Sequence, residues 1–81
     1  MSIGFALISV SPMKEKQVFD QVSKIPEIKE LYPLFGEYDI IAKIETRDFD
    51  GIGSIVIKKI RAIAGVLDTK TLISTESLKG K

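Results

Sequence analysis

An almost unbroken apolar run near the start of the chain constrains the fold more than any other feature. Residues 3–10 read IGFALISV, a length that suits a strand better than a helix. Alternate side chains of an extended strand lie on opposite faces. One face then carries Ile3, Phe5 and Leu7, and the other carries Ala6, Ile8 and Val10. Because both faces are apolar, both must be buried, and the strand is predicted to lie in the middle of a sheet.

The length of the chain, 81 residues, allows one domain. We expect that domain to span residues 1–81, with a core over about residues 3–75 and a polar tail at residues 76–81. A domain of this size buries only roughly 60 to 65% of the surface of the unfolded chain. The chain has no cysteine, so no disulfide or thiolate metal site can add stability. A partner surface is the remaining source, and we expect self-association.

A first helix is predicted to follow the apolar strand. Ser11 and Pro12 favour a helix start, because a serine side chain caps free amides and proline fits the first helical position. Val18 and Val22 then recur at helical spacing among charged residues. The pattern predicts one amphipathic helix over residues 13–24.

Two strands joined by a tight turn come next. The first is predicted over Glu27–Phe35 and the second over Tyr38–Arg47. Pro33 removes a hydrogen-bond donor, so its strand should lie at a sheet edge or be bulged there. Gly36 and Asp39 tolerate positive φ or bond locally, which favours a hairpin turn between the strands.

A second helix is predicted to begin after Asp48, a good N-cap. Gly51 and Gly53 weaken its first turns, so they either allow close backbone packing or keep that end mobile. Gly65 provides the stop, and a last strand is expected over Val66–Thr75. The apolar stripe of this helix consists of Ile52, Ile55, Val56, Ile60 and Ile63.

The predicted order of elements is therefore β-α-β-β-α-β. A partial internal repeat supports it, because residues 22–28 and 60–66 each combine a helix end, a breaker and a strand start. Two such units with right-handed crossovers give an α+β, ferredoxin-like sandwich: a four-stranded antiparallel sheet of order 4-1-3-2 with both helices on one face. The other face is left bare although it is apolar, so we expect it to pack on a second copy.

Composition excludes several classes of function. The chain has no histidine or cysteine, which removes histidine bases, cysteine nucleophiles and ordinary zinc sites. We predict no catalytic residue, no metal and no cofactor, and hence no enzyme. Twelve basic and eleven acidic residues are interspersed, which argues against direct nucleic-acid binding. The basic group Lys58, Lys59 and Arg61 is interpreted as a solvated helix face.

The same chain lacks membrane and export signals. No apolar run approaches the ~18 residues of a membrane span, and Met1–Gly4 lacks the basic region of a signal peptide. We therefore expect a cytoplasmic protein without a membrane partner.

The hairpin tip is the candidate binding site. Glu37 and Asp39 supply carboxylates, Tyr38 an aromatic surface and Gly36 accessible main-chain amides. Such a set can hold a small zwitterion, because carboxylates bind its ammonium and N–H groups bind its carboxylate. In the alternative interpretation, Tyr38 caps the core and the acids face water. The residues alone leave both alternatives open.

Four segments of the chain together resemble one family. The segments are residues 25–30 (IPEIKE), 36–44 (GEYDIIAKI), 59–66 (KIRAIAGV) and 69–73 (TKTLI). They are similar to the C-terminal effector-binding (RAM) domain of the Lrp/AsnC, or feast/famine, transcription regulators, over about residues 3–75. The combination of IPE, GEYD and the late IxGVxxTxT pattern is fairly specific, although each piece alone is weak.

The resemblance implies a ferredoxin-like domain that dimerises through its sheets, as a dimeric α+β barrel, and assembles dimers into octamers or similar rings. It also implies that amino acids or related small effectors bind between dimers, near the turn after the second strand. The effector-binding residues it implies are Gly36, Glu37, Tyr38 and Asp39, followed by Thr69 and Thr71 in the late motif.

Two departures from the family pattern matter. Ala64 stands where the family commonly has proline, and no helix-turn-helix precedes the effector domain in this sequence. The chain looks like a stand-alone version, for which we expect no direct DNA binding and possible co-assembly with full-length Lrp/AsnC regulators. The predicted function is a ligand-binding and oligomerisation module of transcription regulation; the alternative is a structural assembly domain with a vestigial pocket.

Overall fold

The computed structural model describes residues 1–75 and residue 80, so most of the expected tail at residues 76–81 lies outside it. The elements in chain order are β1 (Ser2–Val10), α1 (Glu15–Ser23), β2 (Ile28–Pro33), β3 (Ile40–Thr46), α2 (Phe49–Ile55), a π-helical turn η1 (Val56–Ile60) and β4 (Val66–Ile73). The strands form one antiparallel sheet of order β2-β3-β1-β4. The predicted ferredoxin-like fold and strand order are confirmed.

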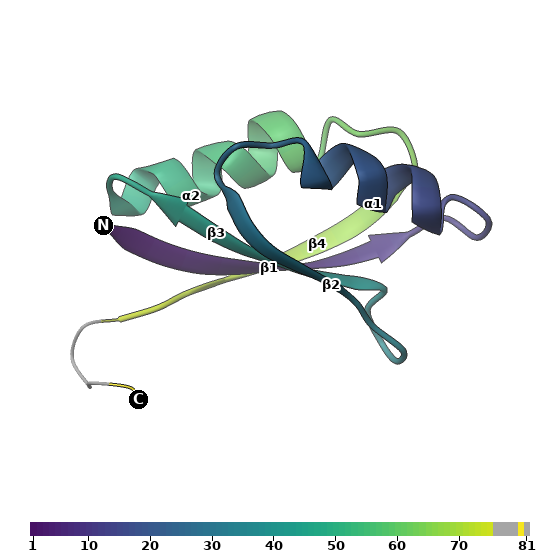
Figure 1. Ribbon diagram of the computed structural model, residues 1–81, viewed down its shortest axis with the longest axis horizontal. Coiled ribbons are helices and arrows are strands. Elements are labelled where there is room, and N and C mark those ends of the chain that lie inside the picture. Colours follow the sequence, from purple (N-terminus) through teal and green to yellow (C-terminus); the bar gives the residue numbers. More distant parts are fainter. Residues whose placement is uncertain (76–79, 81) are drawn as a thin grey trace.

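Strand β1 lies in the middle of this sheet, as its apolar faces predict. Both helices cover the same face of the sheet (Figure 1). Ala6 and Ile8 are fully buried beneath them, in one cluster with Val18 and Val22 of α1. α2 packs closely on β1 at Gly4. A Cβ atom added at this glycine would come 2.5 Å from Ile52 Cγ2. The opposite face carries Ile3, Phe5 and Leu7, which are half-buried.

The hairpin between β2 and β3 is longer than the sequence predicts. β2 lies at the sheet edge, as Pro33 indicated, but it ends at that residue. Its register with β3 shifts between Ile28 and Glu30, away from the proline. The connection runs over residues 34–39 and is closed by a hydrogen bond from Leu34 N to Asp39 O of 2.8 Å. The prediction of a tight turn, with strands reaching Phe35 and Tyr38, is wrong.

The start of α1 also differs from the prediction. The helix begins at Glu15, and no side chain caps it at Lys14. Ser11 instead belongs to a turn, in which its carbonyl accepts a hydrogen bond from Lys14 N (3.0 Å). Ser11 N donates to Gly65 O (2.8 Å), so Ser11 is held beside the segment that enters β4. The chain then turns through Met13, whose φ is 73°, before the helix starts.

The second helical segment begins where the sequence predicts, but it ends at Ile60, before the predicted stop at Gly65. Asp48 is the N-cap, and its Oδ1 accepts a hydrogen bond from Gly51 N (3.0 Å). A Cβ atom added at Gly51 would lie 2.8 Å from Thr46 Cβ, whereas one added at Gly53 would meet nothing within 4 Å. Close backbone packing therefore accounts for the glycine at position 51 but not for the one at position 53. Gly65 has the positive φ that was expected, 103°, but it lies in the turn that leads into β4 and not directly after the helix.

The helix widens before it stops. Arg61 N donates to Val56 O (2.8 Å), a π-helical hydrogen bond across five residues. Ile55, Val56 and Ile60, in and beside the wide turn, are all buried. Regular helical spacing predicted this stripe but not the wide turn.

Candidate functional site

The loop at residues 34–39 projects from the end of the hairpin, on the side of the sheet that the helices leave free (Figure 1). Gly36 has a φ of 154°, which residues with a side chain rarely adopt. Gly36 and Glu37 are exposed, and Tyr38 and Asp39 are half-buried. The structure therefore brings the four predicted hairpin residues together at one accessible tip.

Asp39 anchors this loop to the central strand. Its Oδ2 accepts a hydrogen bond from Val10 N (2.7 Å), at the point where the register of β1 with β4 shifts. Asp39 N donates to Ile8 O (2.9 Å). An ionised carboxylate has about four acceptor sites, so the Asp39 carboxylate can accept further hydrogen bonds besides the one from Val10 N. Asp39 thus has a structural role that the sequence did not indicate.

The two predicted threonines lie elsewhere in the subunit. Thr69 pairs with Ile8 and Thr71 with Ala6, so both β4 side chains point to the helix-covered face. Strand β1 separates β4 from β3, which places the two strands about 10 Å apart. The hairpin loop projects from the other face (Figure 1). Within one subunit the threonines and the hairpin tip do not share a pocket.

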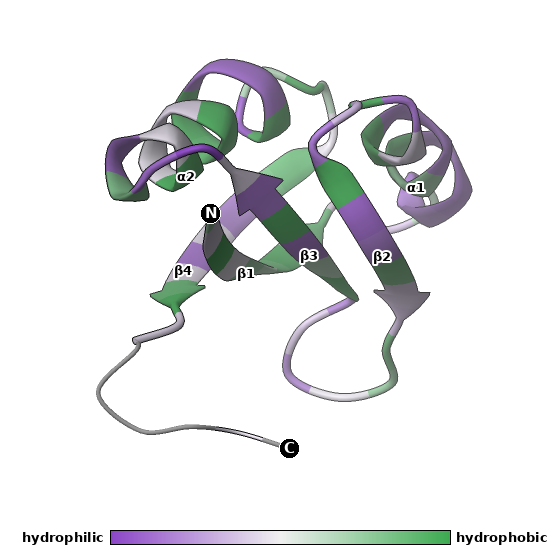
Figure 2. Ribbon diagram, turned by 60° about the vertical axis from the view of Figure 1, so that its left-hand side comes forward, coloured by the Kyte–Doolittle hydropathy of each residue, from purple (hydrophilic) through white to green (hydrophobic). Residues whose placement is uncertain are grey.

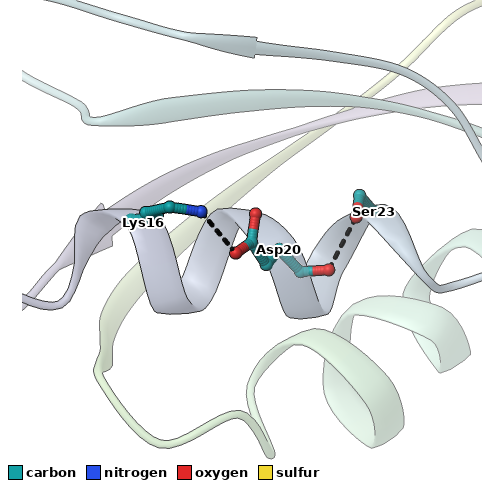
Figure 3. Close-up of polar contacts among 3 residues, drawn as sticks. All are labelled: Lys16, Asp20 and Ser23. Atoms are coloured by element: carbon teal, nitrogen blue, oxygen red, sulfur yellow. Dashed lines mark hydrogen bonds and ion pairs between the residues drawn. The ribbon is translucent and has the colours of Figure 1, made fainter.

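A groove between α1 and the base of the hairpin was not predicted. Its cavity volume is about 310 Å³, and it is lined by Glu15, Lys16, Phe19, Asp20, Pro33, Asp39 and Ile40. Lys16 Nζ and Asp20 Oδ2 form an ion pair of 3.0 Å along the helix beside it (Figure 3). The only sequence signal for the groove is Phe19, which lies next to the buried stripe of α1.

A polar cluster interrupts the bare sheet face. Tyr32 Oη donates to Glu30 Oε1 (2.8 Å), and Lys43 Nζ donates to Glu30 Oε2 (3.2 Å). These two donors hold the pKa of Glu30 below its ordinary value, while the bond to Glu30 raises the pKa of Tyr32. Phe5 and Ile41 line a cavity of about 250 Å³ with these three residues. The cluster is a second feature that sequence reasoning missed.

The described residues contain no group of three or more His, Cys, Asp or Glu side chains that could hold a metal ion. In the same part of the chain, no helix is both long and apolar enough to cross a membrane.

Comparison with known proteins identifies the domain. The sequence profile described as Lrp/AsnC ligand binding domain matches residues 3–81. The chain belongs to this family. An Lrp/AsnC relative, the uncharacterized HTH-type transcriptional regulator PF0250 of Pyrococcus furiosus, is 37% identical over 79 residues, which cover 94% of this chain and 53% of the relative. The chain spans about half the length of the curated relatives it matches.

Solved structures agree with the Lrp/AsnC fold. TTHA0845 from Thermus thermophilus superposes with a TM-score of 0.90 at 24% identity, covering 99% of this chain and 100% of that one. The transcriptional regulator NMB0573 of Neisseria meningitidis, solved as a complex with L-Met, gives a TM-score of 0.82 at 21% identity, covering 98% of this chain and 53% of that one. At these identities the likeness supports the fold alone.

Proposed function

We propose that this Lrp/AsnC domain binds a small effector, an amino acid or a related molecule, at its hairpin loops and acts as a ligand-binding and oligomerisation module of transcription regulation. The observation that carries the proposal is the family match over residues 3–81 together with an accessible GEYD loop anchored through Asp39. The complex of a structural neighbour with L-Met supports an amino acid as the effector class.

Each loop residue has a proposed role in holding the effector. Glu37 and the free acceptor sites of Asp39 bind the ammonium group, since both are carboxylates at one tip. The main chain around Gly36 binds the carboxylate, because glycine lets a ligand approach the backbone closely. Tyr38 forms the apolar wall. No step of this recognition is catalytic.

The two threonines require a second subunit in this proposal. Thr69 and Thr71 lie across the sheet from the loop and on the opposite face, so they contribute from a neighbouring copy. The effector then lies between subunits. Its binding and the assembly of the protein are linked.

Dimerisation is proposed to occur through the bare sheet face. Phe5 lies between Lys43 and Leu72, and Leu7 pairs with Ile41, which makes a continuous apolar area around the polar cluster. Leu72 is 49% exposed. Burial of several hundred Å² at roughly 25 cal/mol per Å² provides several kcal/mol, enough to favour a dimer. Dimers then assemble further, into an octamer or a similar ring.

The names and lengths of the relatives support a proposal about the cellular role. PF0250 is named as an HTH-type regulator and is about twice as long as this chain. We propose that the domain works in the cytoplasm, contacts no DNA itself and co-assembles with full-length Lrp/AsnC regulators through the same surfaces.

A thermal-shift screen with the twenty amino acids tests effector binding. A ligand at 100 times its Kd adds about 2.7 kcal/mol to the stability. One kcal/mol raises Tm by roughly 4–8 °C in a domain of this size, so a true effector raises Tm by about 10 °C or more. Glu37→Gln should reduce the shift, while Asp50→Asn, the same charge change in α2, should leave it intact.

A second candidate function is a structural assembly domain without an effector. The bond between Asp39 and Val10 favours it, because it gives the most prominent acid of the motif a structural purpose. In that case the full panel produces no shift, while substitutions in the loop change only the size of the oligomer.

A further inference from the structure

The end of β1 has a different neighbour on each side. β3 begins at Ile40, which pairs with Ile8, so the last residues of β1 extend beyond it. On the other side β4 continues alongside, and Val10 pairs with Val66. Figure 2 shows β1 between β3 and β4, with the hairpin loop on the side of the sheet away from both helices. The main chain at the end of β1 therefore needs a partner that β3 itself does not supply.

Asp39 supplies that partner. Its main-chain N donates to Ile8 O (2.9 Å), as a further residue of β3 would, and its Oδ2 accepts from Val10 N (2.7 Å). The carboxylate thus takes the place of the next main-chain carbonyl in the ladder. Val10 is buried, so its amide would destabilise the fold if it had no acceptor. The hydrogen bond to Asp39 fixes Val10 from the β3 side.

The same part of β1 faces a bulge in β4. The pairing of the two strands shifts by one residue between Ser9 and Val10, and Leu67 is the extra residue of β4. Just before the bulge, Ser11 N donates to Gly65 O (2.8 Å). The side chain of Leu67 is 66% exposed and packs little against the domain. The bulge is therefore held by main-chain contacts with the end of β1.

The position of this bulge decides where Thr69 and Thr71 point. Side chains alternate along a strand, so a shift of one residue moves each side chain to the other face of the sheet. With the bulge at Leu67, both threonines lie on the helix-covered face, beside Ile8 and Ala6. Whatever fixes the bulge also fixes the face on which the threonines lie.

We propose that Asp39 is a positioning residue for β4. Through Val10 it fixes the bulge, and with the bulge the orientation of Thr69 and Thr71. The two groups of proposed effector residues are thereby coupled inside one subunit, although they lie on opposite faces of the sheet. The coupling requires no ligand. Its consequence for effector binding rests on the proposed function: an ammonium group bound at the other oxygen, Oδ1, holds the carboxylate in place and stabilises the bulge.

NMR spectra recorded without any ligand test this coupling. Asp39→Ala should change the chemical shifts of Ser11 and of residues 66–71 in β4. The nuclear Overhauser contact between Val10 and Val66 should also weaken, because the Val10 amide loses its acceptor and the end of β1 no longer holds the bulge. A residue that only anchors the hairpin would change shifts in the loop, in β3 and at Val10, but not on the far side of β1.

Three matched variants separate the hydrogen bond from the charge. Asp39→Asn removes the charge but keeps an acceptor oxygen, so the β4 shifts should return toward the wild-type values. Asp39→Glu keeps the charge but moves the oxygen one methylene further out, so β4 should change as it does in Asp39→Ala. Glu37→Ala removes an exposed charge from the same loop and should leave β4 unchanged.

Two results overturn the inference: β4 shifts that are unchanged in Asp39→Ala, or β4 shifts that change equally in Asp39→Ala and Asp39→Asn. The first confines the effect of Asp39 to its loop, and the second assigns the effect to charge alone. Because the spectra contain no ligand, they decide the coupling whether or not the amino-acid thermal-shift screen finds an effector. A screen without any shift would remove the proposed effector and leave this inference standing.

Discussion

Removal of the Asp39 carboxylate tests its role in holding the hairpin loop on the central strand. Asp39 makes three hydrogen bonds that hold the loop: its main chain bonds to Ile8 and Leu34, and its side chain accepts from Val10 N at 2.7 Å. Asp39→Ala keeps the main-chain bonds and removes only the side-chain bond. The Val10 amide then loses its acceptor at the point where the register of β1 with β4 shifts. The side chain of Val10 itself is only 6% exposed.

The magnitude follows from the type of bond that is lost. A hydrogen bond to a charged group contributes about 1.5–3 kcal/mol to stability. We expect Asp39→Ala to lower the free energy of unfolding by that amount. Asp39→Asn should lower it less, because the amide oxygen of asparagine can still accept the hydrogen bond from Val10 N. Glu37→Ala is the control, since Glu37 is exposed two positions away in the same loop and surface changes usually stay within about 0.5 kcal/mol.

Urea unfolding followed by circular dichroism measures these differences. All variants must be compared at one subunit concentration, because assembly makes apparent stability depend on concentration. The reasoning is refuted if Asp39→Ala unfolds at the same urea concentration as Glu37→Ala. An Asp39→Asn variant that is less stable than Asp39→Ala would contradict the assignment of the side chain as an acceptor.

Two further predictions concern the second helix. Gly53→Ala should add about 1 kcal/mol to the free energy of unfolding, because the added Cβ meets no atom within 4 Å. Gly51→Ala should be about 1–3 kcal/mol less stable than Gly53→Ala, because its Cβ would lie 2.8 Å from Thr46 Cβ. Equal urea midpoints of the two variants would contradict the close approach at Gly51. The hydrogen bond from Lys59 holds the pKa of Glu27 below its ordinary value of 4.5, so the stability from this pair is present above pH 4.5 and is lost as the pH falls through the lowered value. Lys59→Met should flatten the fall in stability below pH 4.5. Superimposable stability–pH curves for Lys59→Met and the wild type would show that the Glu27–Lys59 pair contributes nothing.

The sequence predicted the elements whose position depends on burial. Strand β1 is central because residues 3–10 are apolar on both faces, and β2 lies at the edge because Pro33 cannot donate to a neighbour. The sequence identifies Asp48 as a helix start because the effect of an N-cap is local. Local chemistry and burial patterns were sufficient for these features.

Features set by contacts between distant residues were missed. Ser11 was expected to cap α1, but its amide bonds to Gly65 O and its carbonyl closes a turn. The hairpin connection is longer than a tight turn, and Asp39 at its end accepts a hydrogen bond from Val10, which is 29 positions away. No local pattern reveals such bonds.

The candidate site shows the same division. Gly36 to Asp39 were located by their turn chemistry, and the structure places them at one tip. The groove beside the tip combines Phe19 of α1 with Pro33 and Ile40 of the hairpin, which only the folded chain brings together. Its walls look like ordinary core residues in the sequence.

The proposed function links assembly and effector binding thermodynamically. The proposed effector residues begin at Gly36, and the bond of Asp39 to β1 holds the loop that carries them. An effector held between subunits binds the assembled form more tightly, so it must favour assembly, and by linkage assembly must raise effector affinity by the same factor. Leu72→Ser should therefore weaken effector binding although Leu72 lies on the bare sheet face and has no proposed contact with the effector. Equal effector affinity in the dimer and in the larger species would show that the two functions are independent.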